Sequence, residues 1–321
     1  MDTKNIDHDR LRRVFFPYAD SKTAAAKASG GRFVYYTTAD VAFSILHRQE
    51  IWMRNAMAMN DFMEISHGFD CLNAAYKGEA GKVLKGILDS CFPGVSEEVE
   101  LFFNGWLPHI RSDTYLTCLS EHRADEDLHG RLSMWRAYGG STGVALVLNG
   151  DVMFGTSNAI GAHSSPVLYA NASSFADEFM NVVKGIERES DYVKSLGRDF
   201  VKNAVFTMLR FAVLCTKHPG FHEELEWRVV ASPTIISSPR LISHVEVVRG
   251  VPQTVVKLKL ENAPSEGLVG LAIPELLNRI IIGPCEFPGV IYRALHQVLR
   301  EIGVQNVEQK IFISDIPLRH P

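Results

Sequence analysis

HEELEWRVV, residues 222–230, decides the fold prediction because it combines a strand pattern with a row of charged side chains. Its aromatic and β-branched residues favour a β-strand, and the Pro-Gly pair just before it signals a turn. Successive side chains of a strand point to opposite faces. The stretch therefore predicts one face with Glu224, Glu226 and Arg228, and an apolar face that carries Trp227.

Two carboxylates held two residues apart on a rigid strand can act on one substrate. One can stabilise developing positive charge while the other handles a proton or a nucleophile. The alternative interpretation is a solvated strand face with an internal Glu/Arg pair, which is common on protein surfaces. The rest of the sequence has to decide between the two.

Composition restricts the class of protein. The chain has 321 residues, of which 46% are hydrophobic and 22% are charged, which is typical of a globular protein of one large or two ordinary domains. The net charge of −4 argues against non-specific electrostatic binding to nucleic acid or to an anionic membrane. Five scattered cysteines and a polar start that does not look like a secretory signal predict a cytoplasmic location and no membrane partner.

Strand and helix signals mix without regular βαβ alternation. This predicts an α+β fold with mixed, largely antiparallel sheets and flanking helices. We expect an N-terminal helical segment over 1–31 and a single domain over 32–321, with a helical insertion at about 172–215. Strands are expected at 32–37, 50–53, 115–120, 143–148, 167–169, 245–248, 254–260, 279–284 and 307–313, the eighth of them stopped by Gly283-Pro284.

Aromatic and hydroxyl side chains cluster in the expected strand at 32–37 and just after it. Tyr35, Tyr36, Thr37 and Thr38 suit a flat heterocycle joined to a ribose, because rings stack and hydroxyls form hydrogen bonds. The alternative places one tyrosine in the core and leaves Thr38 as a helix cap.

Two further clusters follow at expected element ends. Asn60-Asp61 predicts a tight turn that holds a carboxylate, although a turn and helix cap would explain it equally well. Trp135 and Tyr138 lie three residues apart, so they share a helix face just before Gly139-Gly140. They predict either a ligand platform or an aromatic stripe in the core.

The order of these motifs resembles a bacterial domain-of-unknown-function family, the one numbered 2971, over about residues 32–313. In that family the first strand commonly begins with a tyrosine where this chain has Val34, and Phe62-Met63 replace a usual Pro-Phe. The motifs that carry the resemblance are Tyr-Tyr-Thr at 35–37, Asn-Asp-x-x-Glu at 60–64, Cys-Leu-Ser-Glu at 118–121, Met-Trp-x-x-Tyr at 134–138, Glu-x-Glu-Trp-Arg at 224–228 and Arg-Ile-Ile-Ile-Gly-Pro at 279–284.

A fainter resemblance connects three of these landmarks with mono-ADP-ribosyltransferases. It implies an ADP-ribosyltransferase-like fold in which Glu226 binds a ribose hydroxyl and steadies an oxocarbenium-like state, while Glu224 serves the acceptor. It also implies a dinucleotide site that includes Tyr35, Tyr36, Thr37, Thr38, Asn60, Asp61, Trp135, Tyr138 and Arg228. The basic or imidazole residue usual on the first strand is missing, unless Arg32 or Tyr35 replaces it.

The expected activity is therefore an NAD-consuming ADP-ribosyltransferase or NAD glycohydrolase, with NAD as substrate and a protein or nucleic acid as acceptor. A role as a toxin or in phage defence would fit such an enzyme. One alternative is a non-enzymatic sensor that binds a nucleotide or a partner protein. Another is a metal-dependent nuclease with Asp61, Glu64, Glu224 and Glu226 as oxygen ligands.

Overall fold

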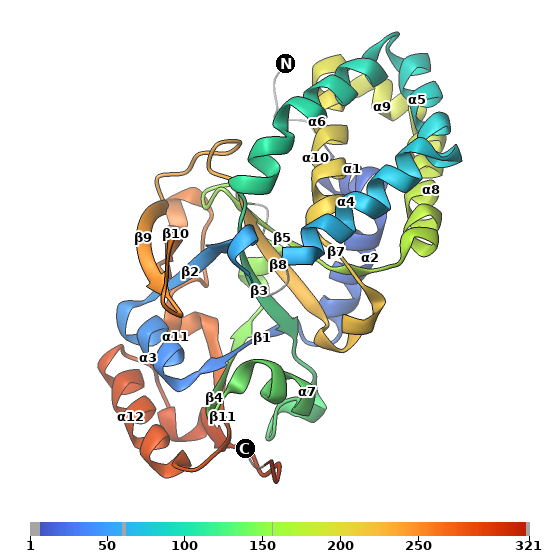
Figure 1. Ribbon diagram of the computed structural model, residues 1–321. Helices are drawn as coiled ribbons and strands as arrows, with labels where there is room; N and C mark the ends of the chain where they lie inside the picture. The colour runs from blue at the N-terminus through green and yellow to red at the C-terminus, as the bar shows by residue number, and fades with distance from the viewer. Residues whose placement is uncertain (1–6, 60–61, 156, 319–321) are drawn as a thin grey trace. The chain divides into compact units, whose positions relative to one another are not determined.

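A computed structural model of the chain describes residues 7–59, 62–155 and 157–318 (Figure 1). Its contacts group the chain into two compact units, each made of three separate segments. Unit 1 comprises Met1–Ala25, Ala56–Thr114 and Ser165–His222, and unit 2 comprises Ala26–Asn55, Tyr115–Ser164 and Glu223–Pro321. The expected single domain over 32–321 stays a prediction, because grouping by contacts does not measure independent folding.

Unit 1 is built almost entirely from helices (Figure 1). Apart from the last two residues of β5 (Ala162–Pro166), its described strands form a short parallel pair, β6 (Leu168–Tyr169) and β7 (Thr216–Lys217). None of the helices in the described part of the chain has the length and apolar character that a membrane span requires. The helices are α1 (His8–Phe15), α2 (Pro17–Ala28, whose last turn belongs to unit 2), α4 (Phe62–Lys77), α5 (Glu79–Cys91), α6 (Val95–Ser112), α8 (Ala172–Arg188), α9 (Ser190–Leu196) and α10 (Arg198–Leu214).

The close packing of α4 on α10 depends on one glycine. A Cβ atom at Gly68 would lie 2.1 Å from the carbonyl oxygen of Val213, well inside van der Waals contact. The missing side chain therefore lets the two helix backbones approach closely. Around this contact the core of unit 1 is mostly apolar, and the charged residues buried in it include Arg210 of α10 and Lys217 of β7, each 2% exposed.

Unit 2 is organised around a mixed sheet, in which the described residues form ten strands. The order along the sheet is β12-β11-β4-β1-β3-β2-β10-β9, and β8 pairs with both β3 and β5. The β11–β12 pair is parallel, and the pairs β1–β3, β1–β4, β2–β3, β2–β10, β3–β8, β4–β11 and β9–β10 are antiparallel. The strands are β1 (Arg32–Thr38), β2 (Glu50–Asn55), β3 (Tyr115–Glu121), β4 (Thr142–Asn149), β5 (Ala162–Pro166), β8 (Glu226–Ala231), β9 (Leu241–Val248), β10 (Val251–Lys259), β11 (Leu277–Cys285) and β12 (Ile311–Ile313).

Helices cover the sheet of unit 2. The helices α3 (Ala39–Arg48) and α12 (Pro288–Glu301) lie side by side and bury Leu46, Leu295 and Leu299 in the largest apolar cluster of this unit (Figure 1). A short segment made of α7 (Leu132–Met134) and the π-helical turn η4 (Trp135–Gly139) packs against β1 and β4. The smaller elements are α11 (Ile273–Leu276) and the turns η2 (Ala56–Ala58, in unit 1), η3 (Ala124–Glu126), η5 (Asp151–Phe154), η6 (Pro219–Glu224), η7 (Pro264–Glu266) and η8 (Val307–Gln309).

This architecture confirms the α+β prediction with a mixed, mostly antiparallel sheet and flanking helices. The helical tract expected at 172–215 is also confirmed, as α8, α9 and α10. The last strand is shorter than expected, because η8 occupies the first part of 307–313.

Two local predictions are wrong. The strand expected over 222–230 begins only at Glu226, because Glu224 ends the turn η6 and Leu225 adopts a left-handed backbone with φ 47°. The strand at 279–284 does not stop at Gly283-Pro284 but continues to Cys285 with a register shift. A Cβ atom at Gly283 would lie 2.8 Å from the indole of Trp135, so this glycine makes room for that ring.

Candidate functional site

Strand β1 divides the predicted tyrosines between the two faces of the sheet of unit 2. Val34 and Tyr36 belong to a buried cluster with Trp135, whereas Phe33 and Tyr35 pack with Trp227 on the other face. We call the first of these the Tyr36 face. There the rings of Tyr36 and Trp135 meet edge to face with centroids 4.8 Å apart, and Trp135 is 1% exposed. Trp135 is therefore a core residue rather than an open stacking platform.

Glu226 and Arg228 of β8 lie on the Tyr36 face. Ser120 of β3 is opposite both Val34 and Glu226 in the antiparallel registers, and opposed side chains share a face. The two residues form an ion pair, with Nε of Arg228 2.8 Å from Oε1 of Glu226. Both are buried, at 6% exposure for Glu226 and 1% for Arg228. The expected internal Glu/Arg pair is thus present, but it is buried rather than solvated.

Glu224 and Tyr138 are brought into contact although they lie far apart in the sequence. The hydroxyl of Tyr138 donates a hydrogen bond to Oε1 of Glu224 at 3.0 Å. Both residues are half-buried, and Tyr138 packs on the edge of the cluster that contains Tyr36 and Trp135. This pair joins the predicted aromatic residues to the predicted acidic ones.

The remaining predicted residues of the first cluster lie elsewhere. Tyr35 points to the opposite face, where burial raises the pKa of its phenol, with a smaller effect from Cys118. Thr37 is buried in β1, and Thr38 precedes helix α3 with its hydroxyl bonded to the carboxylate of Asp40. Asn60 and Asp61 lie outside the described residues, so their predicted role stays a prediction.

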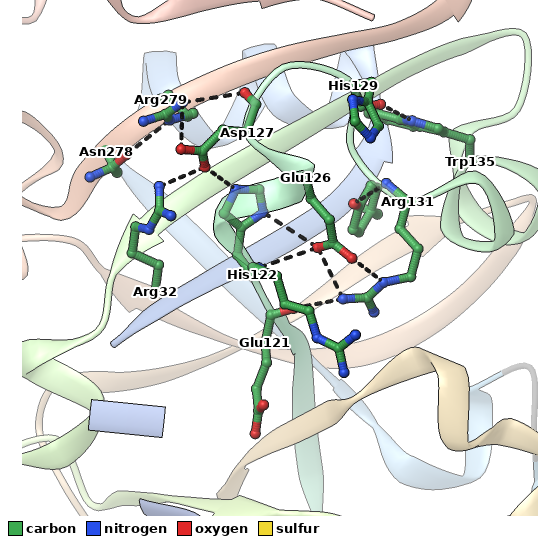
Figure 2. Close-up of polar contacts among 12 residues, drawn as sticks. Arg32, Glu121, His122, Glu126, Asp127, His129, Arg131, Trp135, Asn278 and Arg279 are labelled. Atoms are coloured by element: carbon green, nitrogen blue, oxygen red, sulfur yellow. Dashed lines mark hydrogen bonds and ion pairs between the residues drawn. The ribbon is translucent and has the colours of Figure 1, made fainter. Parts of the chain in front are cut away.

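Arg131 binds a carboxylate and several backbone carbonyls beside this site, and Figure 2 shows its contacts with Glu126 and Glu121. Its guanidinium contacts the carboxylate of Glu126, with Nε 2.7 Å from Oε1 and Nη2 3.1 Å from Oε2. The same group donates to the carbonyl oxygens of Glu121, Glu223 and Glu224 at 2.9, 2.8 and 3.2 Å. These bonds fix the turn that presents the Glu224 carboxylate to Tyr138.

The backbone of Arg131 also bonds to the Tyr36 face. Its N–H donates to the hydroxyl of Tyr36 at 2.8 Å. Burial, together with the nearby carboxylate of Glu126, raises the pKa of Tyr36, so this phenol stays protonated at neutral pH. Arg131 therefore holds the segment that carries Tyr138 in place in two ways, through its guanidinium and through its backbone N–H.

A second polar network anchors the start of the same segment (Figure 2). The fully buried ring of His122 donates from Nε2 to Oδ1 of Asp127 at 2.9 Å, and Arg32 and Arg279 bind the same carboxylate at 2.7 and 3.2 Å. Burial raises the pKa of Asp127 by itself, but the bonds from His122 and Arg32 and the charge of Arg279 outweigh it, so the net shift is downward.

His122 has an unusual second nitrogen. Its Nδ1 has no hydrogen-bond partner among the described residues and lies 3.9 Å from Oε2 of Glu126. Burial lowers the pKa of His122, and the charge of Arg32 adds to this against the opposite effect of Asp127. The ring is therefore neutral in the folded protein near pH 7, with its proton on the nitrogen that faces Asp127.

The sequence analysis missed these two networks. Residues 121–130 are polar and rich in both signs of charge, and none of them is among the predicted site residues. That alternation was the available signal, since a loop with acids, arginines and a histidine can pair internally instead of facing water. Which carboxylate pairs with which cation depends on Arg32 and Arg279, which lie on β1 and β11, far away in the sequence.

The arrangement is best described as a rigid, half-buried pair on a fixed support. Tyr138 and Glu224 offer an aromatic ring and a carboxylate at one edge of the Tyr36 face, and the arginine networks beneath limit their movement. Such preorganisation by supporting hydrogen bonds is what a binding or catalytic site requires. Behind the pair, Glu226 and Arg228 supply buried charge.

Comparison with known proteins supports one part of the family prediction. Residues 134–229 match the family model described as "Protein of unknown function (DUF2971)". The match includes Trp135, Tyr138, Glu224, Glu226 and Arg228, and it covers less of the chain than the motif order suggested. No curated protein and no solved structure matches the chain.

Proposed function

We propose that unit 2 carries the active site of an NAD-consuming, ADP-ribosyltransferase-like enzyme. The observation that carries this proposal is the hydrogen bond between Tyr138 and Glu224, beside the Glu226 strand and on the edge of the Tyr36 cluster. Aromatic and acidic residues from separate parts of the sequence thus meet at one edge. A transferase acting on NAD needs this combination, because it must hold a flat pyridinium ring and stabilise a sugar cation.

The proposed reaction assigns a task to each residue. Tyr138 would stack on nicotinamide while the bond between C1′ of the ribose and the ring nitrogen breaks, and nicotinamide leaves with the bonding electron pair. The acceptor's lone pair forms the new bond to C1′, and its proton passes to Glu224. Glu226, oriented by Arg228, would accept a hydrogen bond from the ribose 2′-hydroxyl and stabilise the cation.

The acceptor determines which enzyme this is. Water as acceptor would make the protein an NAD glycohydrolase that releases ADP-ribose, whereas a nucleophile on a protein or nucleic acid would make it a transferase. The scattered free cysteines fit a cytoplasmic location, in which a toxin or phage-defence effector would meet NAD.

Release of nicotinamide from NAD tests the proposal. We expect release by the unmodified protein, and a loss of about 100-fold or more in Glu224→Gln, the size usual for removal of a general base. Glu223→Gln is the matched control, because Glu223 is the exposed neighbour and keeps its backbone bond to Arg131. Absence of release with every acceptor tried, and no shift in melting temperature with NAD, would refute the proposal.

A second candidate is a non-enzymatic module that binds a nucleotide or a partner. The observation that favours it is the burial of Glu226, which is 6% exposed and bound to Arg228 instead of facing a substrate. NAD or another nucleotide would then raise the melting temperature without turnover. Glu226→Gln separates the candidates, since an enzyme loses nicotinamide release, whereas a module keeps its ligand-induced shift.

A further inference from the structure

Unit 1 contains a cavity of about 90 Å³ between α1, α2, α8, α10 and the chain just before β6. Six of its seventeen lining residues are aromatic, namely Phe15, Phe16, Tyr18, Phe175, Phe179 and Phe211. Phe175 and Phe179 are stacked with centroids 6.2 Å apart, and Phe16 meets Phe211 edge to face at 6.3 Å. The cavity is therefore bordered on several sides by π-systems.

Glu178 is the one charged residue among the described residues of this lining. It is half-buried on α8, between the two stacked phenylalanines in the sequence, and makes no ion pair in the described part of the chain. Its nearest polar contact is the amide of Asn181, with Nδ2 3.5 Å from Oε2. The carboxylate thus sits at an aromatic cavity without a cation beside it.

The other polar groups of the lining donate their protons to the protein itself. The hydroxyls of Tyr18, Thr216 and Ser165 donate to backbone carbonyls at 3.0, 2.7 and 3.2 Å. Pro17 and Pro166 in the lining have no N–H at all. A ligand would meet acceptors, aromatic faces and one negative charge, but few donors.

We propose that this cavity binds a small organic cation, an alkylammonium whose short apolar body fills the aromatic cavity and whose charged head pairs with Glu178. Aromatic faces attract cations through their quadrupole, and carboxylates attract them by charge. An anion would be repelled by Glu178 and would lack donors. The cavity is smaller than the ~150 Å³ cavity that holds benzene in an engineered protein, which favours a short branched chain over a ring system.

Three probes of the same shape and different charge test the proposal by titration calorimetry on the full chain. Isopropylammonium is expected to bind, isopropyl alcohol to bind roughly tenfold more weakly, and isobutyrate not to bind. Glu178→Gln is expected to weaken the ammonium about tenfold and leave the alcohol unchanged. Asp177→Asn is the matched control, since Asp177 is the exposed neighbouring carboxylate on α8 and does not line the cavity.

A cavity-filling variant keeps the test independent of Glu178. Ala212→Leu places a larger side chain in the lining and is expected to abolish binding of both ligands, with folding checked by its unfolding curve. Binding that survives Ala212→Leu would place the ligand elsewhere and overturn the proposal. So would an alcohol that binds as tightly as the ammonium, or no binding of any probe to the unmodified protein.

Discussion

The two units differ in what surrounds a buried arginine side chain. In unit 2, Arg228 is 1% exposed and pairs with Glu226, and Arg131 pairs with Glu126 while it also binds three carbonyl oxygens. In unit 1, Arg210 is 2% exposed, yet its Nε and Nη1 have no hydrogen-bond partner among the described residues. A buried charge stabilises a fold only when it is compensated. Unit 2 uses arginine to fix loops, whereas Arg210 of unit 1 forms no ion pair with a described carboxylate and lies with its Cζ 5.2 Å from the centroid of the Phe211 ring.

The largest expected effect comes from Arg131→Leu. This change removes five hydrogen bonds and leaves the carboxylate of Glu126 buried without its cation. We expect the free energy of unfolding from urea titration to fall by about 3–5 kcal/mol. Arg136→Leu, at the exposed neighbouring arginine, should change it by less than about 0.5 kcal/mol. Equal effects of the two changes would show that the partners of Arg131 do not stabilise unit 2.

Arg210→Met should have an effect of the opposite sign. Methionine fills a similar space without the charge, so we expect the free energy of unfolding to rise by roughly 1–3 kcal/mol near pH 7. Burial lowers the pKa of Arg210 to about 10. A base whose pKa is lower in the folded than in the unfolded state destabilises the folded protein while it is protonated. The difference in unfolding free energy between Arg210→Met and the unmodified protein should therefore shrink as the pH rises through about 10. Lys184→Met on the exposed side of α8 is the control. A destabilised Arg210→Met would mean that the guanidinium has a compensating role.

The variant His122→Gln should change how the stability of unit 2 depends on pH. The folded pKa of His122 is lowered, mainly by burial, so the unfolded chain binds a proton more readily below its usual value of about 6.5. Stability is therefore lost as the pH falls from there towards the folded pKa. In the variant, the drop in unfolding free energy between about pH 7.5 and pH 5 should be smaller, by on the order of 1 kcal/mol. An unchanged pH profile would assign the acid sensitivity to other groups.

Local pattern was sufficient to predict most of the sheet. The alternation at the end of the stretch 222–230 correctly places Trp227 on the face opposite to Glu226 and Arg228. Trp227 packs against Phe33 on that face of β8. The same alternation places Tyr35 and Tyr36 on opposite faces of the sheet. The predicted ligand cluster contained both tyrosines and so did not take the alternation into account. Chemical similarity of neighbours in a strand does not place them on the same face.

The candidate site depended on contacts that no local pattern contains. Glu224 leaves the strand because Leu225 is left-handed, and the carbonyls before it are held by Arg131, 92 and 93 positions away. The contact between Tyr138 and Glu224 spans 86 positions. A sequence shows that such groups are present, but the pairing is decided by the register of the whole sheet.

The place of β4 in the sheet has a consequence for synthesis on the ribosome. Its neighbours are β1, which is made earlier, and β11, which is made only after β5 to β10 and the helices α8 to α10. Until Leu277–Cys285 emerges, the nascent chain exposes one edge of a strand whose Val144 and Ala145 become fully buried in the finished protein. Such an edge invites aggregation and chaperone binding. Stalled nascent chains that end before Leu277 should therefore be degraded by protease at β4, and full-length chains should resist.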